Sequence, residues 1–229
     1  MKSQLLIPAA GMGVRLGCQG PKAMALLAGE PLLVRTLKRF QPVKLVEGAV
    51  IVAPPGTIPM FCETLTAYFP GMDFEFSEGG SERQISVGNG LDRIDSATEL
   101  VLIHDAARPF VDDGSIRACQ EAAAAWGAAT VAVPCVDTIL EADADRSLIK
   151  TPDRQALWSC QTPQTFQVSV IREAYAQARA SNYVATDDAT LVRRTGKKVM
   201  IVPGTALNFK VTTPVDLALA ELIIEKGWT

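Results

Sequence analysis

The chain has 229 residues, with 22 Lys and Arg against 25 Asp and Glu, so its formal net charge is −3 at pH 7. This balance, without a clustered basic stripe, excludes a general polyanion binder, and we expect no nucleic-acid partner. Hydrophobic residues make up 48% of the chain and charged residues 21%, which excludes a disordered chain and is enough for the core of a single domain, 1–229.

Short apolar, β-prone runs alternate along the chain with amphipathic segments of helical length. The predicted strands are Gln4–Ile7, Gly48–Ala53, Asp73–Phe76, Glu99–His104, Ala128–Val133 and Lys198–Val202. The predicted helices are Pro31–Phe40, Ile58–Phe69, Glu82–Ile94, Gly114–Trp126, Val168–Ala180 and Pro214–Lys226. This alternation predicts an α/β fold with a mostly parallel sheet that helices cover on both faces.

The segment 134–158 does not fit the alternation. Two short apolar runs, Thr138–Leu140 and Ser147–Ile149, flank an acidic turn, which predicts a β-hairpin that projects from the α/β body. Two interpretations remain open for it: a solvated surface hairpin, or an arm that grips a second subunit.

The sequence does not indicate a membrane protein or a secreted protein. The longest stretch of small apolar residues, Ala122–Val133, is interrupted by Gly127 and falls short of the roughly 18 residues that a spanning helix needs. The first residues lack the apolar core of a signal peptide. Five cysteines at irregular spacings, without a CxxC pair, indicate reduced thiols. We therefore expect a cytoplasmic protein without a membrane partner.

The first predicted strand runs into a loop of small residues, Pro8–Gly17, that is followed by Gly20-Pro21-Lys22. Small residues let backbone N–H groups approach a phosphate, and Arg15 and Lys22 add two cations to the same loop. The loop is not a dinucleotide fingerprint, because Leu16 stands where GxGxxG needs glycine, and it is not a Walker A loop. A purely structural glycine turn remains the alternative.

Two more strand ends carry polar residues, and ligands bind at this edge of a parallel sheet. Ser81 follows a glycine pair and could contact a ligand or only cap the next helix. Asp105 ends an apolar strand, where it could hold Mg²⁺ on a bound phosphate or form a local ion pair with Arg108. We expect His104, the only histidine, to be a hydrogen-bonded core residue rather than a catalyst.

The C-terminal half contains several polar islands, each of which could be a turn on its own. They are Asp153-Arg154, Gln161–Gln164, Thr186–Asp188 and Asn208–Thr213. With the first half they supply a set of cations in an acidic protein: Arg15, Lys22, Arg108, Arg154 and Lys210. This set predicts a polyphosphate substrate, because phosphoryl and nucleotidyl transfer need mainly positioning and charge stabilisation.

The motifs taken together resemble the 2-C-methyl-D-erythritol 4-phosphate cytidylyltransferase family of the non-mevalonate isoprenoid pathway. They are PAAGxGxRxG…PK, GGxxRxxSVxxGL, HDAARPF, DTI, LWxxQTPQxF, TDDA and NxKVTTPxDLxLAE, in this order over nearly the whole chain. The resemblance implies a three-layer, Rossmann-like nucleotidyltransferase fold with a projecting β-hairpin arm. It also implies a homodimer that uses CTP, 2-C-methyl-D-erythritol 4-phosphate and Mg²⁺, with in-line attack of the substrate phosphate on the α-phosphorus of CTP.

The resemblance assigns roles to residues at matching positions. Arg15, Lys22 and Lys210 would be catalytic. The nucleotide would contact Ala9, Ala10, Gly11, Gly13, Gly80, Ser81 and Ser86. The methylerythritol phosphate would contact Asp105, Ala106, Arg108, Thr138, Arg154 and Thr162, with Thr138 and Arg154 reaching across from the other subunit. Asp105 is also the candidate metal ligand.

Two positions depart from the family pattern: Ser81, where many relatives carry an acidic residue, and Leu140, where a lysine is common. The nearest rival function is a cytidylyltransferase for another polyol phosphate such as ribitol 5-phosphate, with discriminating residues near Arg154, Thr162 and Asp187. A non-catalytic nucleotide-sensing module would not need both Lys22 and Lys210. A dinucleotide-dependent oxidoreductase is disfavoured, because its third glycine is missing and Ala53-Pro54-Pro55 supplies no acid after the second strand.

Overall fold

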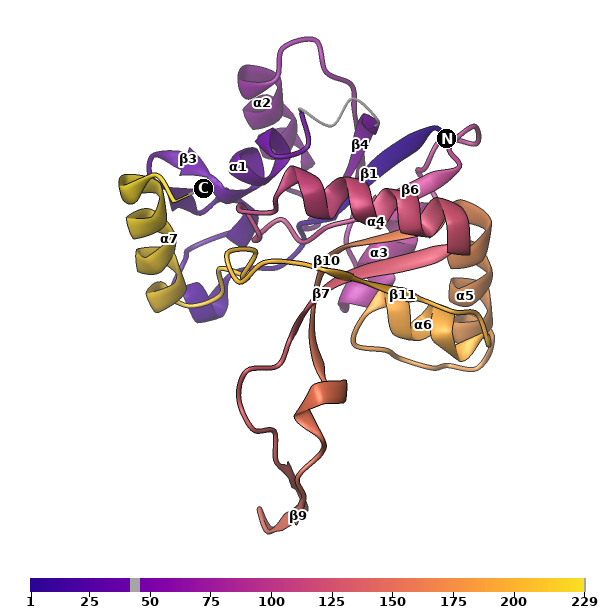
Figure 1. The fold of residues 1–229 in the computed structure, drawn as a ribbon. Helices are drawn as coiled ribbons and strands as arrows, with labels where there is room; N and C mark the ends of the chain where they lie inside the picture. Colours follow the sequence, from indigo (N-terminus) through magenta and orange to yellow (C-terminus); the bar gives the residue numbers. More distant parts are fainter. Residues whose placement is uncertain (42–45, 229) are drawn as a thin grey trace.

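A computed structural model describes residues 1–41 and 46–228 and contains a central seven-stranded sheet of order β11-β7-β10-β6-β1-β4-β5 (Figure 1). The strands are β1 Ser3–Pro8, β4 Val46–Ala53, β5 Phe74–Glu78, β6 Leu100–Ile103, β7 Ala128–Pro134, β10 Trp158–Gln167 and β11 Met200–Pro203. All run parallel except β10, which lies antiparallel between β6 and β7. The predicted α/β class with a mostly parallel sheet is therefore confirmed.

Helices cover both faces of the sheet, as Figure 1 shows. They are α1 Leu32–Lys38, α2 Ile58–Tyr68, α3 Arg83–Leu91, α4 Asp113–Trp126, α5 Val168–Ala180, α6 Asp188–Arg194 and α7 Pro214–Lys226. Side chains alternate across β1, so Leu5 and Ile7 pack in the core with α1, α2 and α4, and Leu6 packs with α3, α5 and α6. The two cores and the sheet make the three layers.

α7 lies at the side of this sandwich, against the small hairpin of β2 (Leu26–Leu27) and β3 (Glu30–Pro31). Its start agrees with the sequence pattern, because Thr213 accepts from the Asp216 backbone and Asp216 accepts from the Thr213 backbone. This capping box fixes the point at which the chain leaves the Lys210 segment and enters the helix.

The sequence pattern does not predict the short hairpin β2–β3, the strand β10 or the helix α6. The residues Gln161–Gln164 of β10 form a polar island in the sequence, and polar residues with Pro163 are not typical of a central strand. The register of β10 shifts between Cys160 and Gln164, so the strand passes the proline with an irregularity. α6 is too short for its periodicity to predict a helix, and Asp187 caps it by accepting from the Thr190 backbone.

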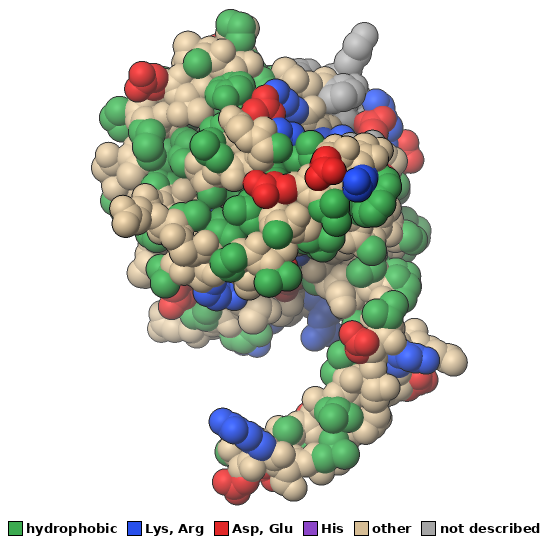
Figure 2. Space-filling model, turned by 90° about the vertical axis from the view of Figure 1, so that its left-hand side faces the viewer, with side chains coloured by type: hydrophobic (Ala, Val, Ile, Leu, Met, Phe, Trp, Pro, Cys, Tyr) green, Lys and Arg blue, Asp and Glu red, His purple; other side chains and the backbone are tan. Residues whose placement is uncertain are grey.

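The segment 134–158 projects from the body as an arm, visible at the bottom of Figures 1 and 2. The predicted strand Thr138–Leu140 is wrong: β8 is Glu141–Ala142, within the expected acidic turn, and it pairs with β9, Leu148–Lys150. The cause is a tight turn in which Asp143 accepts from the backbones of Asp145 and Ser147, which brings the paired residues next to it.

The arm leaves apolar side chains uncovered. Val136, Leu140, Leu148 and Ile149 are all exposed, with Val136 at 81%. Figure 2 shows such side chains along the arm, away from the rest of the chain. Uncovered apolar groups on a projecting hairpin are typical of a surface that another chain covers.

The described residues contain no helix that is long and apolar enough to cross a membrane. All five cysteines are free thiols in the structure.

The alternative that Ser81 only caps the next helix does not agree with the observed start of α3. Glu82 occupies the N-cap without a side-chain hydrogen bond, and Ser81 lies outside the helix.

The packing of α3 on the sheet generates a stability prediction. A Cβ on Gly90 would lie 2.8 Å from both Leu6 Cδ1 and Val52 Cγ2, which are in the fully buried core. We expect Gly90→Ala to lower the free energy of unfolding by about 1–3 kcal/mol through overpacking. Gly88→Ala is the matched control in the same helix, because its Cβ would meet Tyr175 at an ordinary 3.5 Å. Urea unfolding that ranks the two variants equally would contradict this account.

Candidate active site

A cavity of about 380 Å³ opens at the carboxyl ends of β1, β5 and β6. This edge of a parallel sheet is where ligands bind, because the strand-to-helix loops converge there. Most of the predicted site residues line it: Ala9, Ala10, Gly11, Gly13, Arg15, Lys22, Gly80, Ser81, Ser86, Asp105, Ala106 and Lys210. The sequence motifs, far apart along the chain, therefore meet in one place.

The loop after β1 folds back on itself to bring its two cations to the cavity. The Lys22 backbone N–H donates to Gly11 O at 2.8 Å, which closes the loop around the 3-10 turn Val14–Leu16, and a second 3-10 turn, Lys22–Met24, begins at Lys22 itself. Gly13 has a φ of +68°, and a Cβ there would lie 3.1 Å from Lys22 Cβ. Glycine at this position permits both the turn and the close approach of Lys22.

The second glycine turn packs directly on the first loop. A Cβ on Gly79 would lie 2.3 Å from Ala10 Cβ, so no larger residue fits between the loops. Ser86 holds this turn, since its hydroxyl accepts from the Gly80 N–H at 3.1 Å and donates to Glu82 O at 3.0 Å. Ser86 is thus a buried support of the turn as well as part of the cavity wall.

Asp105, just beyond β6, is surrounded by cations. Lys210 Nζ is 2.9 Å from Asp105 Oδ2, Arg108 Nε is 3.5 Å from the same oxygen, and Arg83 Nε is 3.6 Å from Oδ1. Burial acts to raise the pKa of Asp105, but Lys210, Arg83 and Arg108 outweigh it and hold that pKa well below its usual range. The carboxylate is therefore ionised at any physiological pH.

For Lys22 the surroundings disfavour the charged form. Burial, and then the positive charge of Lys210, lower the pKa of Lys22 to about 8, although Asp105 partly compensates. The cavity therefore carries more positive charge than its one central carboxylate neutralises, which favours an anionic ligand.

His104 is a core residue, as the sequence indicated. It is fully buried with its ring against Phe40, and burial lowers the pKa of His104 to about 4, so the ring is neutral. The Thr162 hydroxyl lies 3.0 Å from His104 Nδ1 and accepts from the Asp105 backbone N–H at 3.0 Å. The hydroxyl proton must then point to Nδ1, which leaves Nε2 to donate to Arg108 O at 3.1 Å.

Arg108 and Thr162 are not among the residues that line the cavity. Arg108 Nη1 donates to Asn208 O at 2.7 Å, and Asn208 Nδ2 donates to Thr162 O at 2.8 Å. These bonds tie the Lys210 segment to β10 and to the end of β6. In this structure the two residues hold Asp105 and Lys210 in place.

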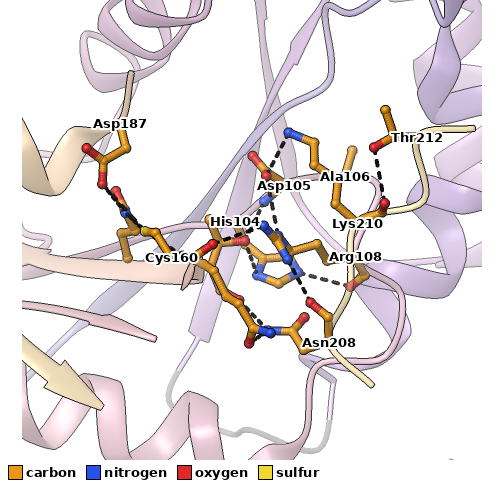
Figure 3. A network of polar contacts seen from close by, with 12 residues as sticks. His104, Asp105, Ala106, Arg108, Cys160, Asp187, Asn208, Lys210 and Thr212 are labelled. Atoms are coloured by element: carbon orange, nitrogen blue, oxygen red, sulfur yellow. Dashed lines mark hydrogen bonds and ion pairs between the residues drawn. The ribbon is translucent and has the colours of Figure 1, made fainter. Parts of the chain in front are cut away.

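The two arm residues of the predicted site lie elsewhere. Thr138 and Arg154 are exposed on the arm and do not line this cavity, and Arg154 Nη1 donates to Val136 O at 3.0 Å. Asp187, predicted to discriminate substrates, accepts from Gln164 Nε2 at 2.8 Å beside Cys160 (Figure 3). The sequence pattern does not identify Arg83 as a site residue, although Arg83 stands in the GGxxR motif, because this motif is also typical of a helix start.

The cavity offers few side chains that could bind a metal ion. Within residues 1–41 and 46–228, no group of three or more His, Cys, Asp and Glu side chains could hold one. Asp105 is an ionised carboxylate at the cavity, and Mg²⁺ commonly binds one or two carboxylates together with phosphate oxygens and waters. The donor set fits Mg²⁺ only when a phosphate ligand supplies the other oxygens.

Comparison with known proteins gives a consistent result. The profile of the 2-C-methyl-D-erythritol 4-phosphate cytidylyltransferase family matches residues 4–226. A cytidylyltransferase of that name from Syntrophus aciditrophicus is 40% identical over 222 residues, which cover 96% of this chain and 95% of the relative. One from Geobacillus thermodenitrificans is 42% identical over 224 residues, 98% of this chain and 97% of the relative.

Solved structures agree on the fold. The 4-diphosphocytidyl-2C-methyl-D-erythritol synthase of Anaerococcus prevotii matches with a TM-score of 0.87 at 27% identity, covering 98% of each chain. The 2-C-methyl-D-erythritol 4-phosphate cytidylyltransferase of Thermus thermophilus matches with a TM-score of 0.81 at 37% identity, covering 98% of this chain and all of the other.

The charge of Lys22 generates a stability prediction. Its pKa of about 8 in the fold is below the ordinary 10.5, so the folded state binds fewer protons between these values and protonated Lys22 destabilises the fold below pH 8. We expect Lys22→Met to raise the melting temperature at pH 7 by roughly 2–4 °C, the shift produced by about 1 kcal/mol. The gain shrinks towards pH 10.

Calorimetry at both pH values checks this result. Lys150→Met, at an exposed position on β9, is the control and should show no such pH-dependent gain. A lower melting temperature for Lys22→Met at pH 7 would contradict the cost assigned to the buried, protonated Lys22.

Proposed function

The chain belongs to the 2-C-methyl-D-erythritol 4-phosphate cytidylyltransferase family, and from this premise we propose how its cavity performs the family's reaction. CTP and 2-C-methyl-D-erythritol 4-phosphate give 4-diphosphocytidyl-2-C-methyl-D-erythritol and pyrophosphate, a step in isoprenoid precursor biosynthesis. The observation that carries the proposal is the convergence of Arg15, Lys22 and Lys210 around Asp105 in one cavity. A cytoplasmic location, where CTP and reduced thiols are found, is part of the proposal.

The reaction is an in-line displacement at the α-phosphorus of CTP. An oxygen of the methylerythritol phosphate forms the new bond to phosphorus, and the bond from phosphorus to the β-phosphate oxygen breaks, releasing pyrophosphate. A phosphate monoester has its second pKa near 6 and is already anionic at neutral pH, so the attack needs no general base. The neutral, buried state of His104 is compatible with this chemistry.

The cations stabilise the charge that gathers in the transition state. Arg15 and Lys22, on the loop after β1, face the triphosphate, and Lys210 approaches from the segment before α7. A bound triphosphate raises the pKa of Lys22 from about 8, because nearby negative charge favours the ammonium. Lys22 is then fully charged at the moment when its charge is needed.

The two glycine loops form the nucleotide side of the cavity. Backbone groups at Ala9, Ala10, Gly11 and Gly13 approach the nucleotide from one loop, and Gly80, Ser81 and Ser86 face base and ribose from the other. On the acceptor side, Asp105 and Ala106 contact the polyol, whose hydroxyls donate to the carboxylate. Arg108 and Thr162 act there by holding Asp105 and its loop.

Mg²⁺ is the proposed cofactor, and Asp105 is the residue of this cavity that would hold it together with substrate phosphate oxygens. When bound it neutralises phosphate charge and favours departure of pyrophosphate. The lysines and arginines of the chain supply the rest of the positive charge.

We further propose that the protein acts as a homodimer whose arm completes the partner's site. Thr138 and Arg154 lie on the arm and do not line the cavity of their own chain, and the arm carries uncovered apolar side chains such as Val136 and Ile149. A second chain that covers these groups would remove the cost of their exposure to water. Arg154 would then contact the methylerythritol phosphate across the interface.

Pyrophosphate release tests the reaction directly. We expect release from CTP and Mg²⁺ with 2-C-methyl-D-erythritol 4-phosphate, much slower release with ribitol 5-phosphate, and none after chelation of the metal. Lys22→Ala and Lys210→Ala should each lower kcat by about 10² to 10³, the usual loss when one transition-state contact is removed.

Lys197→Ala is the matched control, since it removes only a surface ion pair with Glu173. A near-normal kcat in both cavity variants would contradict the catalytic roles of Lys22 and Lys210. A preference for ribitol 5-phosphate would keep the mechanism and change the acceptor.

Mixed dimers test the shared site. Lys22→Ala damages the body of the site and Arg154→Ala the arm, so each variant alone should be nearly inactive. A heterodimer has one site built from an intact body and an intact arm, and random exchange should restore about a quarter of the wild-type activity. Mixing Lys22→Ala with Lys210→Ala, both body residues, should restore none. No recovery in the first mixture would mean that each arm serves its own chain or none.

A further inference from the structure

Arg83, the first residue of α3, lies between two carboxylates that belong to different parts of the fold. Its Nε is 3.6 Å from Asp105 Oδ1, and its Nη1 donates to Asp188 Oδ2 at 2.8 Å. The side chain is 31% exposed and lines the cavity, so it connects the site with the layer of helices behind it.

The Asp188 end of this connection is rigid. Asp188 is the first residue of α6, and its side chain is 1% exposed. Its Oδ1 accepts from the Tyr175 hydroxyl of α5 at 2.6 Å, and its backbone N–H donates to Gln164 Oε1 of β10 at 3.1 Å. Asp188 does not line the cavity, so its carboxylate is an anchor rather than a ligand contact.

At the other end of this connection, three cations share the Asp105 carboxylate. Lys210 and Arg108 both contact Asp105 Oδ2, whereas Arg83 faces Oδ1. When the ammonium of Lys210 turns to substrate phosphate, the carboxylate loses its nearest cation. Arg83 stays in place, because its other nitrogen is bound to the fixed Asp188. A lysine could not replace it, since a single ammonium cannot serve two separated carboxylates as a planar guanidinium does.

We propose that Arg83 is a positioning residue for the acceptor polyol, which acts by holding the Asp105 carboxylate from its anchor on Asp188. This inference rests on the proposed function, in which Asp105 accepts the polyol hydroxyls. At saturating Mg²⁺ the effect falls on the acceptor, because the two polar partners that the structure gives Arg83 are the carboxylates of Asp105 and Asp188.

Steady-state kinetics of Arg83→Gln test the inference. We expect the KM for 2-C-methyl-D-erythritol 4-phosphate to rise about tenfold to a hundredfold, the usual result of a misplaced binding group. The KM for CTP should stay within about twofold, since uniform binding of the nucleotide is unchanged. Arg83→Lys keeps the charge and should recover only part of the loss.

Arg83→Gln alone leaves the buried Asp188 charge without its cation, which destabilises a fold. The double variant Arg83→Gln with Asp188→Asn removes both charges, and it should fold and still show the raised acceptor KM. Arg172→Gln is the matched control: Arg172 Nη2 bonds Leu91 O and Ile94 O at the other end of α3 and does not touch Asp105. It should leave both KM values unchanged.

The outcomes are separable. An unchanged acceptor KM in the double variant, or a KM increase for CTP instead, would overturn the positioning role. Equal effects of Arg172→Gln would overturn it too, because loosening of α3 would then be the cause. A wild-type protein that releases no pyrophosphate would overturn the proposed function and this inference with it.

Discussion

The site depends on holding several cations near one another around a single carboxylate. Lys22, Lys210, Arg108 and Arg83 gather at Asp105 in a protein whose net charge is −3. Burial and then the charge of Lys210 disfavour the ammonium of Lys22, and Asp105 offsets only part of this cost, so the pKa of Lys22 is lowered. The positive charge in excess of Asp105 favours an anionic ligand.

Asp105 can stay among these cations because the surrounding fold fixes its backbone. β6 runs between β1 and β10 in the middle of the sheet, and the Thr162 hydroxyl of β10 accepts a hydrogen bond from the Asp105 backbone N–H. His104, one residue earlier, is neutral, and its Nδ1 accepts a hydrogen bond from the Thr162 hydroxyl, so this polar ring lies in the core without a buried charge. The chain thus uses its one histidine to support the site rather than to catalyse.

β10 has a second effect on the site. As the one antiparallel strand of the sheet, it leads directly out of the arm and then passes beside β6. Gln164 on this strand accepts from the Asp188 backbone and donates to Asp187, which fixes the start of α6. The arm, α6 and the Asp105 end of the cavity therefore all adjoin one strand, β10.

The sequence by itself determined the element order, the positions of the cationic residues and the family, because hydrophobic periodicity and glycine-rich loops are local signals. Most predicted strands and helices lie within about two residues of the observed ones, at the usual precision of element ends. It could not reveal α6, which is short, or β10, whose Gln164 bonds Thr130 and the Asp188 backbone far along the chain.

Only the tertiary structure decided which cations meet and which stand apart. Arg83 reads as an ordinary helix-start residue, and it becomes a link between Asp105 and Asp188 because α3 and α6 pack on the same face of the sheet. Thr162 reads as a ligand contact, and the fold turns its hydroxyl towards His104 instead. Side-chain direction depends on which elements pack together, and that information is spread over the whole chain rather than held in any one motif.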